Sequence, residues 1–370
     1  MRLASFNVEN LFDRAVALNN ENWSVGRPAL EAVTRLNRLL NHPTYSAADK
    51  AKIMELLRFL GLEKKDDGGE YAVLRQNRGK LVSRTKTGPV IVANGRTDWI
   101  GWVELKTEPV NELATRHTAM VMRDVGADVQ AVVEAEDRPA LLKFMSIVFK
   151  VVNATPYGHV MLIDGNDDRG IDVALMTKAD HEIVRIRSHV DDADTVGRIF
   201  SRDCPEYTVR TPSGERLVVL INHFKSKGFG SNTGERRRRQ AARVAEIYTG
   251  LIADGDQHVA IVGDLNDTPD SAPLAPLVAA TDLKDISAHP EFDDGAGGAR
   301  PGTYGTGTAR NKIDYILLSP ALFARVQGGG IFRRGAWAGE HGTIWEHYET
   351  ITRPAEAASD HSAIYADIQI

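Results

Sequence analysis

The sequence predicts an α/β protein, because apolar runs typical of buried strands alternate along the chain with segments of helical periodicity. A second observation is that polar residues repeatedly follow the apolar runs. In residues 259–269 (VAIVGDLNDTP), four apolar residues precede Gly263, and Asp264, Asn266 and Asp267 follow it. This cluster alone also fits an Asx turn that caps the next segment. In α/β enzymes, however, strand ends carry the chemistry, so we expect a site at a sheet edge.

The composition is that of an ordinary globular protein, with 370 residues, 42% hydrophobic and 26% charged. The formal net charge of −5 excludes a global basic field that would recruit nucleic acid, so any polyanion site must be local. The single Cys204 excludes an internal disulfide framework. The N-terminus shows no apolar leader and no run of 18 apolar residues occurs, so we expect a cytoplasmic protein without membrane contact. No obligate protein partner is evident.

The first third of the chain contains a strand and a candidate insertion. Residues 3–8 predict a strand that ends in Asn7, Glu9 and Asn10. Residues 28–62 predict a helical hairpin, and residues 71–106 predict two or three strands. Residues 71–97 carry six basic residues and no acidic one, which fits either contact with phosphates or a solvated ribbon protected by edge charges. We expect residues 14–107 to form an insertion.

The middle of the chain adds two more strands with polar ends. A helix over 110–125 ends at Gly126, and the strand over 128–134 that follows it ends in Glu134. A further helix is expected over 139–152. A polar turn at 164–172 leads into a strand at 173–176, and Arg169 in that turn is a candidate phosphate contact or an ion-pair partner of Asp167 or Asp168.

Residues 216–228 (RLVVLINHFKSKG) form the strongest predicted strand, and Asn222, His223, Lys225 and Lys227 lie at its end. A lone histidine after a strand is commonly a structural residue, but one flanked by asparagine and lysines is a better catalytic candidate. A helix is predicted over 235–252, with the arginines of 236–239 on its solvent side.

The C-terminal third supplies the remaining candidates. A short strand or turn is expected at 282–286 and a mobile glycine-rich loop at 295–307. The strand over 312–319 begins near Asp314, and the last strand follows Asp360 and His361. Residues 328–349 are predicted to form a glycine-bearing loop that holds Trp337 and Trp345.

The residues at the strand ends share a chemistry of five carboxylates, three carboxamides, two imidazoles and no thiol. They are Asn7, Glu9, Glu134, Asn222, His223, Asp264, Asn266, Asp314, Asp360 and His361. Oxygen ligands of this kind suit magnesium or manganese, whereas a zinc site would use several histidines or cysteines. The set therefore predicts a hard divalent cation acting on a phosphate ester.

Six motifs carry a resemblance to a known family: FNVEN at Asn7, DVQAVVEAE at Glu134, NHFKSK at His223, GDLND at Asp264, KIDYILLS at Asp314 and ASDH at His361. Together, in this order, they resemble the endonuclease/exonuclease/phosphatase superfamily of metal-dependent phosphodiesterases. NHFKSKG is similar to the form in bacterial nuclease-like members. The resemblance covers nearly the whole chain apart from the insertion.

The resemblance implies a four-layer α/β sandwich, with two mixed β-sheets packed face to face and helices outside. It implies one catalytic domain over residues 1–370, interrupted at about 14–107. It also implies that Glu134 and Asn7, helped by Asp360 or Glu9, hold a magnesium ion that neutralises a phosphate oxygen.

The remaining roles also follow from the resemblance. Asp264 and Asn266 would orient or deprotonate the attacking water, while His361, oriented by Asp314, would contact the phosphate or act as base. His223 with Asn222 would lie near the leaving oxygen. Further contacts to substrate are expected from basic and aromatic residues, namely Arg169, Lys225, Lys227, Arg236, Arg239, Trp337 and Trp345.

The function favoured by these observations is magnesium-dependent hydrolysis of phosphodiester bonds in nucleic acid, with DNA as the preferred partner and manganese as an alternative ion. A first alternative is a phosphatase or phosphodiesterase for a small or lipid phosphate ester, although no amphipathic membrane-seeking stretch is visible. A second is a non-catalytic nucleic-acid-binding protein. It is disfavoured because every expected acid and histidine position is filled.

Overall fold

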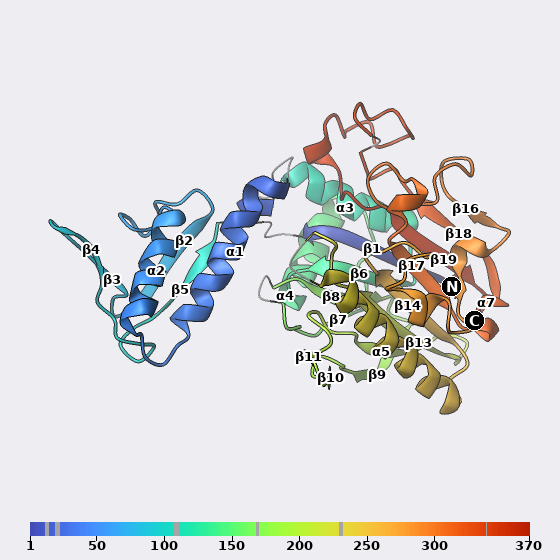
Figure 1. The fold of residues 1–370 in the computed structure, drawn as a ribbon. Coiled ribbons are helices and arrows are strands. Elements are labelled where there is room, and N and C mark those ends of the chain that lie inside the picture. Colours follow the sequence, from blue (N-terminus) through green and yellow to red (C-terminus); the bar gives the residue numbers. More distant parts are fainter. Residues whose placement is uncertain (12–14, 19–22, 107–110, 168–169, 229–231, 338) are drawn as a thin grey trace. The chain divides into compact units, whose positions relative to one another are not determined.

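The computed structural model describes residues 1–11, 15–18, 23–106, 111–167, 170–228, 232–337 and 339–370. The chain forms two compact units. Unit 1 comprises Met1–Phe12 and Asn111–Ile370, and unit 2 comprises Asp13–Val110. Figure 1 shows the elements of each unit. That the whole chain is one catalytic domain interrupted by an insertion stays a prediction.

Within the described part of unit 1, the larger sheet has the strand order β16-β18-β19-β1-β6-β8-β7. In chain order its strands are β1 (Arg2–Leu11), β6 (Val129–Ala135), β7 (His159–Leu162), β8 (Asp172–Thr177), β16 (Phe292–Asp293), β18 (Val326–Phe332) and β19 (Ala363–Ile368). The central pair β1 and β6 is parallel, while β1 pairs antiparallel with β19. The sheet is therefore mixed, and the carboxyl ends of β1 and β6 share one edge.

The second large sheet has the order β15-β17-β14-β13-β12-β9 among the described residues. Its strands are β9 (Glu182–Arg187), β12 (Glu206–Arg210), β13 (Arg216–His223), β14 (Val259–Asp264), β15 (Lys284–Asp285) and β17 (Asp314–Leu318). A small separate hairpin consists of β10 (Ala193–Asp194) and β11 (Gly197–Arg198). Strands β13 and β14 are parallel, and β14 and β17 are antiparallel, so this sheet is also mixed.

Helices cover the outer faces of both sheets. They are α3 (Glu112–Val125), α4 (Arg138–Phe144) with a π-helical continuation over Met145–Phe149, α5 (Thr233–Ala253) and α6 (Ala275–Val278). The short α7 (Pro320–Phe323) instead places Leu322 in the apolar layer between the sheets. Asn111 caps α3 at its start, and Gly126 ends it in the left-handed conformation. Figure 1 shows α3 and α5 on opposite sides of the strands.

The two sheets pack face to face through alternating apolar residues. Leu217, Val219 and Ile221 of β13 lie in the same buried cluster as Val129 and Val133 of β6. The other faces of the strands bury residues against the helices, with one cluster beside α3 and α4 and another beside α5 and α6. Because three buried layers separate four layers of secondary structure, the predicted α/β sandwich is confirmed.

Unit 2 contains two α-helices, a short 3₁₀ helix (Val16–Leu18) and four strands among its described residues. The helices are α1 (Trp23–Leu40) and α2 (Ala47–Phe59), and the strands are β2 (Ala72–Arg78), β3 (Val82–Thr85), β4 (Gly88–Ile91) and β5 (Ile100–Leu105). Strand β2 pairs with β5 and β3 pairs with β4, both antiparallel. Ser46 caps α2 through a reciprocal pair of hydrogen bonds with Asp49.

Two expectations for the C-terminal third need correction. Residues 328–349 were expected to form a loop, but Gly328 to Gly330 lie inside β18. A Cβ atom at Gly329 would lie 2.7 Å from the carbonyl oxygen of Tyr365, so glycine there permits close strand approach. The 295–307 segment is held by hydrogen bonds, since the Asp294 carboxylate accepts from the backbone nitrogens of Ala296 and Arg300 at 2.8 Å.

The two chain ends meet in unit 1, where the N-terminal nitrogen of Met1 donates to the carbonyl oxygen of Ile368 at 2.7 Å. Arg2 further pairs with Asp367 at 2.7 Å. Within the residues that the structure describes, none of the helices has the length and apolarity needed to cross a membrane.

Candidate active site

Strand periodicity brings three predicted residues to the same end of the layer between the sheets. Side chains of alternate residues in a strand point to the same face. Ile221 of β13 and Val262 of β14 lie in the inter-sheet cluster, so His223 and Asp264, two positions later, continue the same face. His223 pairs in register with Asp264, and Asp264 pairs with Asp314 of β17. The register thus aligns a histidine and two carboxylates in a row across three adjacent strands.

Asn7 connects this row to the other sheet. Its Nδ2 atom lies 3.3 Å from Oε1 of Glu134 and 3.3 Å from Oδ2 of Asp264, and donates to both. The Nε2 atom of His223 lies 3.6 Å from Glu134 Oε1 and 3.8 Å from Asp264 Oδ2. Both sheets therefore contribute to one polar group, the site cluster of Asn7, Glu134, His223, Asp264, Asp314 and His361.

His361 joins the site cluster through Asp314. Its Nδ1 atom donates to Oδ2 of Asp314 at 2.7 Å, which directs Nε2 toward Asn7, 3.5 Å away. Thr303 also donates its hydroxyl to Asp314 Oδ2, at 2.5 Å. The imidazole is buried, and its orientation is fixed by the carboxylate behind it.

Three residues around the site cluster adopt the left-handed conformation that non-glycine residues rarely take. Their φ angles are 52° for Glu9, 67° for Glu134 and 55° for Asn266, and only Asn153 and Asn232 share this property among the other described non-glycine residues. Such strain costs about 1–3 kcal/mol per residue and gathers at functional sites. Here Glu134 lies at a register shift in β6, between Val133 and Ala135, and Asn266 lies in the bend that follows Asp264.

Gly263 permits the close approach of β13 and β14 just before the site. Its φ angle is +122°, and a Cβ atom there would lie 2.0 Å from the carbonyl oxygen of Asn222. Directly after it, Asn266 donates from its backbone nitrogen to Asp264 Oδ1 at 2.8 Å and from Nδ2 to Oδ2 at 3.1 Å. The GDLND motif thus fixes the carboxylate of Asp264 from two sides.

Burial and charge shift the pKa values of two groups of the site. Burial, followed by the nearby Asp314 carboxylate, raises the pKa of Asp264 to about 8, against an opposing effect of His361. Burial lowers the pKa of His361, but the charge and hydrogen bond of Asp314 outweigh it, so the pKa lies well above its usual value. A cationic imidazole therefore faces a carboxyl group that titrates near neutral pH.

Two groups of atoms in the site suit a divalent cation. Ligand atoms of Asp264, Asp314 and His361 lie within 4.8 Å of one another. This group is already paired internally through the His361–Asp314 hydrogen bond, which a cation would have to break. Glu134, whose side chain is 17% exposed, offers a carboxylate with access to solvent. We favour Glu134 for a magnesium-type ion, which keeps several water ligands.

The other residues expected to bind the ion lie beside Glu134 or nearby in the chain. Asn7 accepts a hydrogen bond from the Glu9 backbone nitrogen through Oδ1 at 3.1 Å, so its amide must turn to offer that oxygen to a cation. Glu9 Oε2 accepts from the Asp360 backbone nitrogen at 3.0 Å. Asp360 Oδ1 lies 3.8 Å from His361 Nε2. The donor set is rich in oxygen and fits a hard cation.

The basic residues expected to bind substrate have different environments. Lys227 pairs with Asp267 at 2.6 Å, and Lys225 lies in the same loop after β13. Arg236 is exposed on α5, whereas Arg239 donates to Asp194 of the β10–β11 hairpin at 2.6 Å. Their contacts with substrate stay predictions. Arg169 lies outside the described residues.

The two tryptophans expected to stack on substrate make contacts within their own segment. Trp345 is 9% exposed, donates from Nε1 to the Ala336 carbonyl at 3.2 Å and lies under the guanidinium of Arg333. Trp337 stacks on His347, with ring centroids 5.3 Å apart. Their stacking on substrate stays a prediction, and Trp345 has a role in the local core.

Sequence reasoning missed residues that support the site cluster. Tyr304 bridges to His361 in the backbone, and their ring centroids lie 5.0 Å apart. Ser359 donates its hydroxyl to the Asn7 carbonyl at 2.7 Å and accepts from the His361 backbone nitrogen. Tyr304 and Thr303 lie in a glycine-rich segment that was interpreted as a loop, so no signal in the sequence identified them. Ser359 is the second residue of the ASDH motif, and the motif was the signal that could have identified it.

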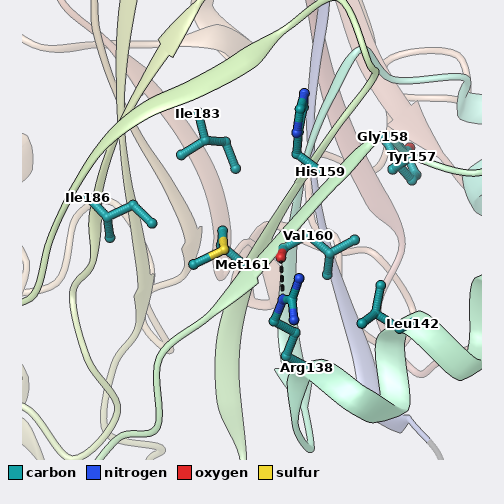
Figure 2. Close-up of a pocket in the computed structure, with 9 residues that line it drawn as sticks. All are labelled: Arg138, Leu142, Tyr157, Gly158, His159, Val160, Met161, Ile183 and Ile186. Carbon is teal, nitrogen blue, oxygen red and sulfur yellow. Dashed lines mark hydrogen bonds between the residues drawn. The ribbon is translucent and has the colours of Figure 1, made fainter.

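A separate cavity of about 230 Å³ lies between α4 and strands β7 and β9 (Figure 2). Arg138 at one side donates from Nε to the Val160 carbonyl at 2.8 Å. Apolar residues such as Leu142, Met161 and Ile183 line much of the rest. None of the predicted site residues lines this cavity.

Comparison with known proteins identifies the family and the fold. A model of the Endonuclease/Exonuclease/phosphatase family matches residues 76–361. That span contains five of the six residues of the site cluster, and Asn7 lies before it. No curated protein matches the sequence.

Several solved structures are similar in fold. A mannosyl-6-phosphatase of Bacteroides thetaiotaomicron is 14% identical with a TM-score of 0.50, and the match covers 70% of this chain and 92% of that one. An endonuclease/exonuclease/phosphatase of Bacteroides vulgatus is 16% identical (TM-score 0.48; 70% and 91% covered). Sphingomyelinase C of Streptomyces griseocarneus is 18% identical (TM-score 0.46; 69% and 92% covered). At these identities the likeness concerns the fold alone.

Proposed function

Because this chain belongs to the Endonuclease/Exonuclease/phosphatase family, whose members hydrolyse phosphate esters, we propose that it is a metal-dependent phosphodiesterase that cleaves nucleic acid, with DNA as its preferred substrate. The proposal includes endonuclease or exonuclease action, magnesium as the ion with manganese as a substitute, and a location in the cytoplasm.

One observation carries the proposal. Asn7, Glu134, His223, Asp264 and His361 come from five segments far apart in the sequence, yet each has a polar atom 3.3–3.8 Å from a polar atom of at least one other member of the set. Burying so many polar groups together costs stability unless they are paired or serve a function. A structural role does not require two buried histidines beside an anionic group at the end of the inter-sheet layer.

The site residues support distinct roles in hydrolysis. Asp264 has a pKa near the working pH, which is the property that a general base for the attacking water needs. Asn266 holds that carboxylate in place with two hydrogen bonds. His361, kept cationic by Asp314, suits contact with a phosphate oxygen better than proton abstraction.

His223 suits the leaving-group side. Its ring is buried, and Nε2 faces the carboxylates of Glu134 and Asp264. From there it would donate a hydrogen bond to the oxygen on which negative charge develops. A divalent cation held by Glu134 and Asn7 would add charge neutralisation at a non-bridging phosphate oxygen. Asp264 would thus contact the water, His361 the phosphate and His223 the leaving oxygen.

The test is cleavage of supercoiled plasmid by the purified full chain with magnesium. We expect nicking that EDTA abolishes and that Asp264→Ala and His361→Ala reduce by roughly 10²-fold or more. Glu134→Gln should weaken manganese binding in calorimetry. Glu246→Gln is the charge-matched control, because that carboxylate is 66% exposed on α5. Full cleavage by Asp264→Ala would refute the site.

Substrate class is decided by a parallel set of assays. Single-stranded DNA, RNA, sphingomyelin and bis-p-nitrophenyl phosphate are offered to the same preparation. Hydrolysis of the small diester with no cleavage of DNA would retain the site cluster but overturn the nucleic-acid assignment. Cleavage of DNA faster than of the small diester supports the proposal as written.

A further inference from the structure

The sheet formed by β2 and β5 in unit 2 has one covered and one open face. Leu74 of β2 and Val103 of β5 are opposite each other and buried. Asn37 of α1 also binds both backbone groups of Val103, at 2.8 Å and 2.9 Å. Alternate residues must then point away from this buried side. The outward residues determine what the open face can bind.

The open face combines apolar and cationic side chains in register. Trp102 is 42% exposed and lies opposite Arg75, and Ile100 is 43% exposed and lies opposite Arg78. A large exposed aromatic residue on a strand is unusual because burial would stabilise it. Each of these apolar residues thus has an arginine as its cross-strand partner, so the open face presents both kinds of group side by side.

Charge on this part of unit 2 is strongly one-sided. Residues 72–106 contain seven basic and two acidic residues, in a chain whose net charge is −5. Arg75 pairs with Glu104 across the strands. By contrast, no ion pair joins the side chains of Arg78, Lys80 or Lys86 to any residue that the structure describes. Cations that lack an ion-pair partner among the described residues are available to an external anion.

We propose that the outer face of the β2–β5 sheet, centred on Trp102 and Arg78, is an accessory binding surface for single-stranded nucleic acid. An exposed indole offers a plane for stacking an unpaired base, and the neighbouring cations offer contacts for successive phosphates. A duplex covers its base planes and would use only the charges. This surface acts without the site cluster, so the inference is independent of the proposed hydrolysis.

The test measures binding of a fluorescent 20-nucleotide deoxythymidine oligomer to the full chain in EDTA, where no metal supports cleavage. Trp102→Ala should weaken binding about tenfold, since stacking one base contributes roughly 1–3 kcal/mol. Trp102→Phe should restore most of the affinity. Phe59→Ala is the matched control, because Phe59 is 60% exposed on α2 in the same unit.

Salt dependence tests the charges separately. Arg78→Ala should reduce the slope of log affinity against log salt by roughly 0.7, the value for one phosphate contact on a single strand. Arg35→Ala, which removes an exposed charge from α1, should leave the slope unchanged. Duplex DNA of the same length should not distinguish Trp102→Ala from the original chain.

The outcomes separate this inference from the catalytic one. Trp102→Ala should hydrolyse bis-p-nitrophenyl phosphate as fast as the original chain, because the site cluster lies in unit 1. Its far-UV circular dichroism should also match that of the original chain, which shows that unit 2 of the variant is folded. Unchanged oligomer affinity in Trp102→Ala, or equal weakening by Phe59→Ala, would overturn the inference. An original chain with no affinity for the oligomer would overturn it as well, whether or not plasmid is cleaved.

Discussion

Arg237 donates a hydrogen bond from Nε to Oδ2 of Asp267 at 2.9 Å, and both side chains are almost fully buried. The same guanidinium donates from Nη1 to the Lys225 carbonyl at 2.8 Å. One arginine at the start of α5 therefore fixes the loop after β13 relative to the loop after β14. These loops carry the residues that follow His223 and Asp264, so Arg237 is a positioning residue for the site.

Replacing Arg237 should damage stability and activity together. Arg237→Ala leaves the Asp267 carboxylate with only Lys227 as a basic partner and should cost about 2–4 kcal/mol in urea unfolding. The neighbouring Arg238 pairs with Glu235 in solvent, so Arg238→Ala should leave the urea unfolding midpoint almost unchanged. Equal losses for the two variants would contradict the role of Arg237.

Asp314→Asn should lower the pKa of His361, because the carboxylate raises it against the effect of burial. Proton NMR of the imidazole signals in EDTA would show the titration of His361 moving to lower pH. Hydrolysis should fall by roughly 10²–10⁴-fold, since the imidazole loses both its charge and its orientation. An unshifted His361 titration would show that Asp314 does not control the ring.

Gly263→Ala should destabilise the protein by roughly 3 kcal/mol, because its φ of +122° and the Asn222 carbonyl 2.0 Å away leave no place for a Cβ atom. Gly250→Ala is the opposite case. Gly250 lies inside α5 with nothing within 4 Å of an added Cβ, so alanine should stabilise by about 0.5–1 kcal/mol. Thermal unfolding of the two variants distinguishes a required glycine from a replaceable one.

Asp172 should make stability depend on pH. Burial, opposed by a hydrogen bond from the Gly165 backbone, raises its pKa from 3.8 to about 6. Between these values the folded state keeps a proton that the unfolded state has lost, so this group reduces stability as pH rises from about 4 to 6.

Asp172→Asn removes that loss and should stabilise the protein by about 1–2 kcal/mol at pH 7.5, a figure reduced for solvent screening. The difference between the variant and the original chain should disappear at about pH 3, below the unfolded pKa of 3.8, where the carboxyl is largely protonated in both states. Urea unfolding across this range makes the measurement. A difference that is constant with pH would mean that the titration of Asp172 is not its cause.

Much of the fold was predictable because strand and helix periodicity is local information. The strands that carry Glu134, His223 and Asp264 near their ends were all expected. The family resemblance added the expectation of two mixed sheets packed face to face. Other strands were missed. The three glycines at 328–330 suggested a loop, yet they allow β18 to approach β19 closely. The edge strand β9 was also missed, because its charged and largely exposed residues do not form an apolar run.

The sequence by itself determined which chemical groups the protein offers, because a carboxylate, amide or imidazole residue can be identified at the end of each predicted strand. Only the tertiary structure decided which of them meet: the Asn7 amide reaches Glu134 and Asp264 across the two sheets, and Arg237 is buried although its neighbours on α5 are largely solvated. Local patterns report which face of an element a residue occupies, whereas the distance between two side chains depends on the register and packing of elements far apart in the chain.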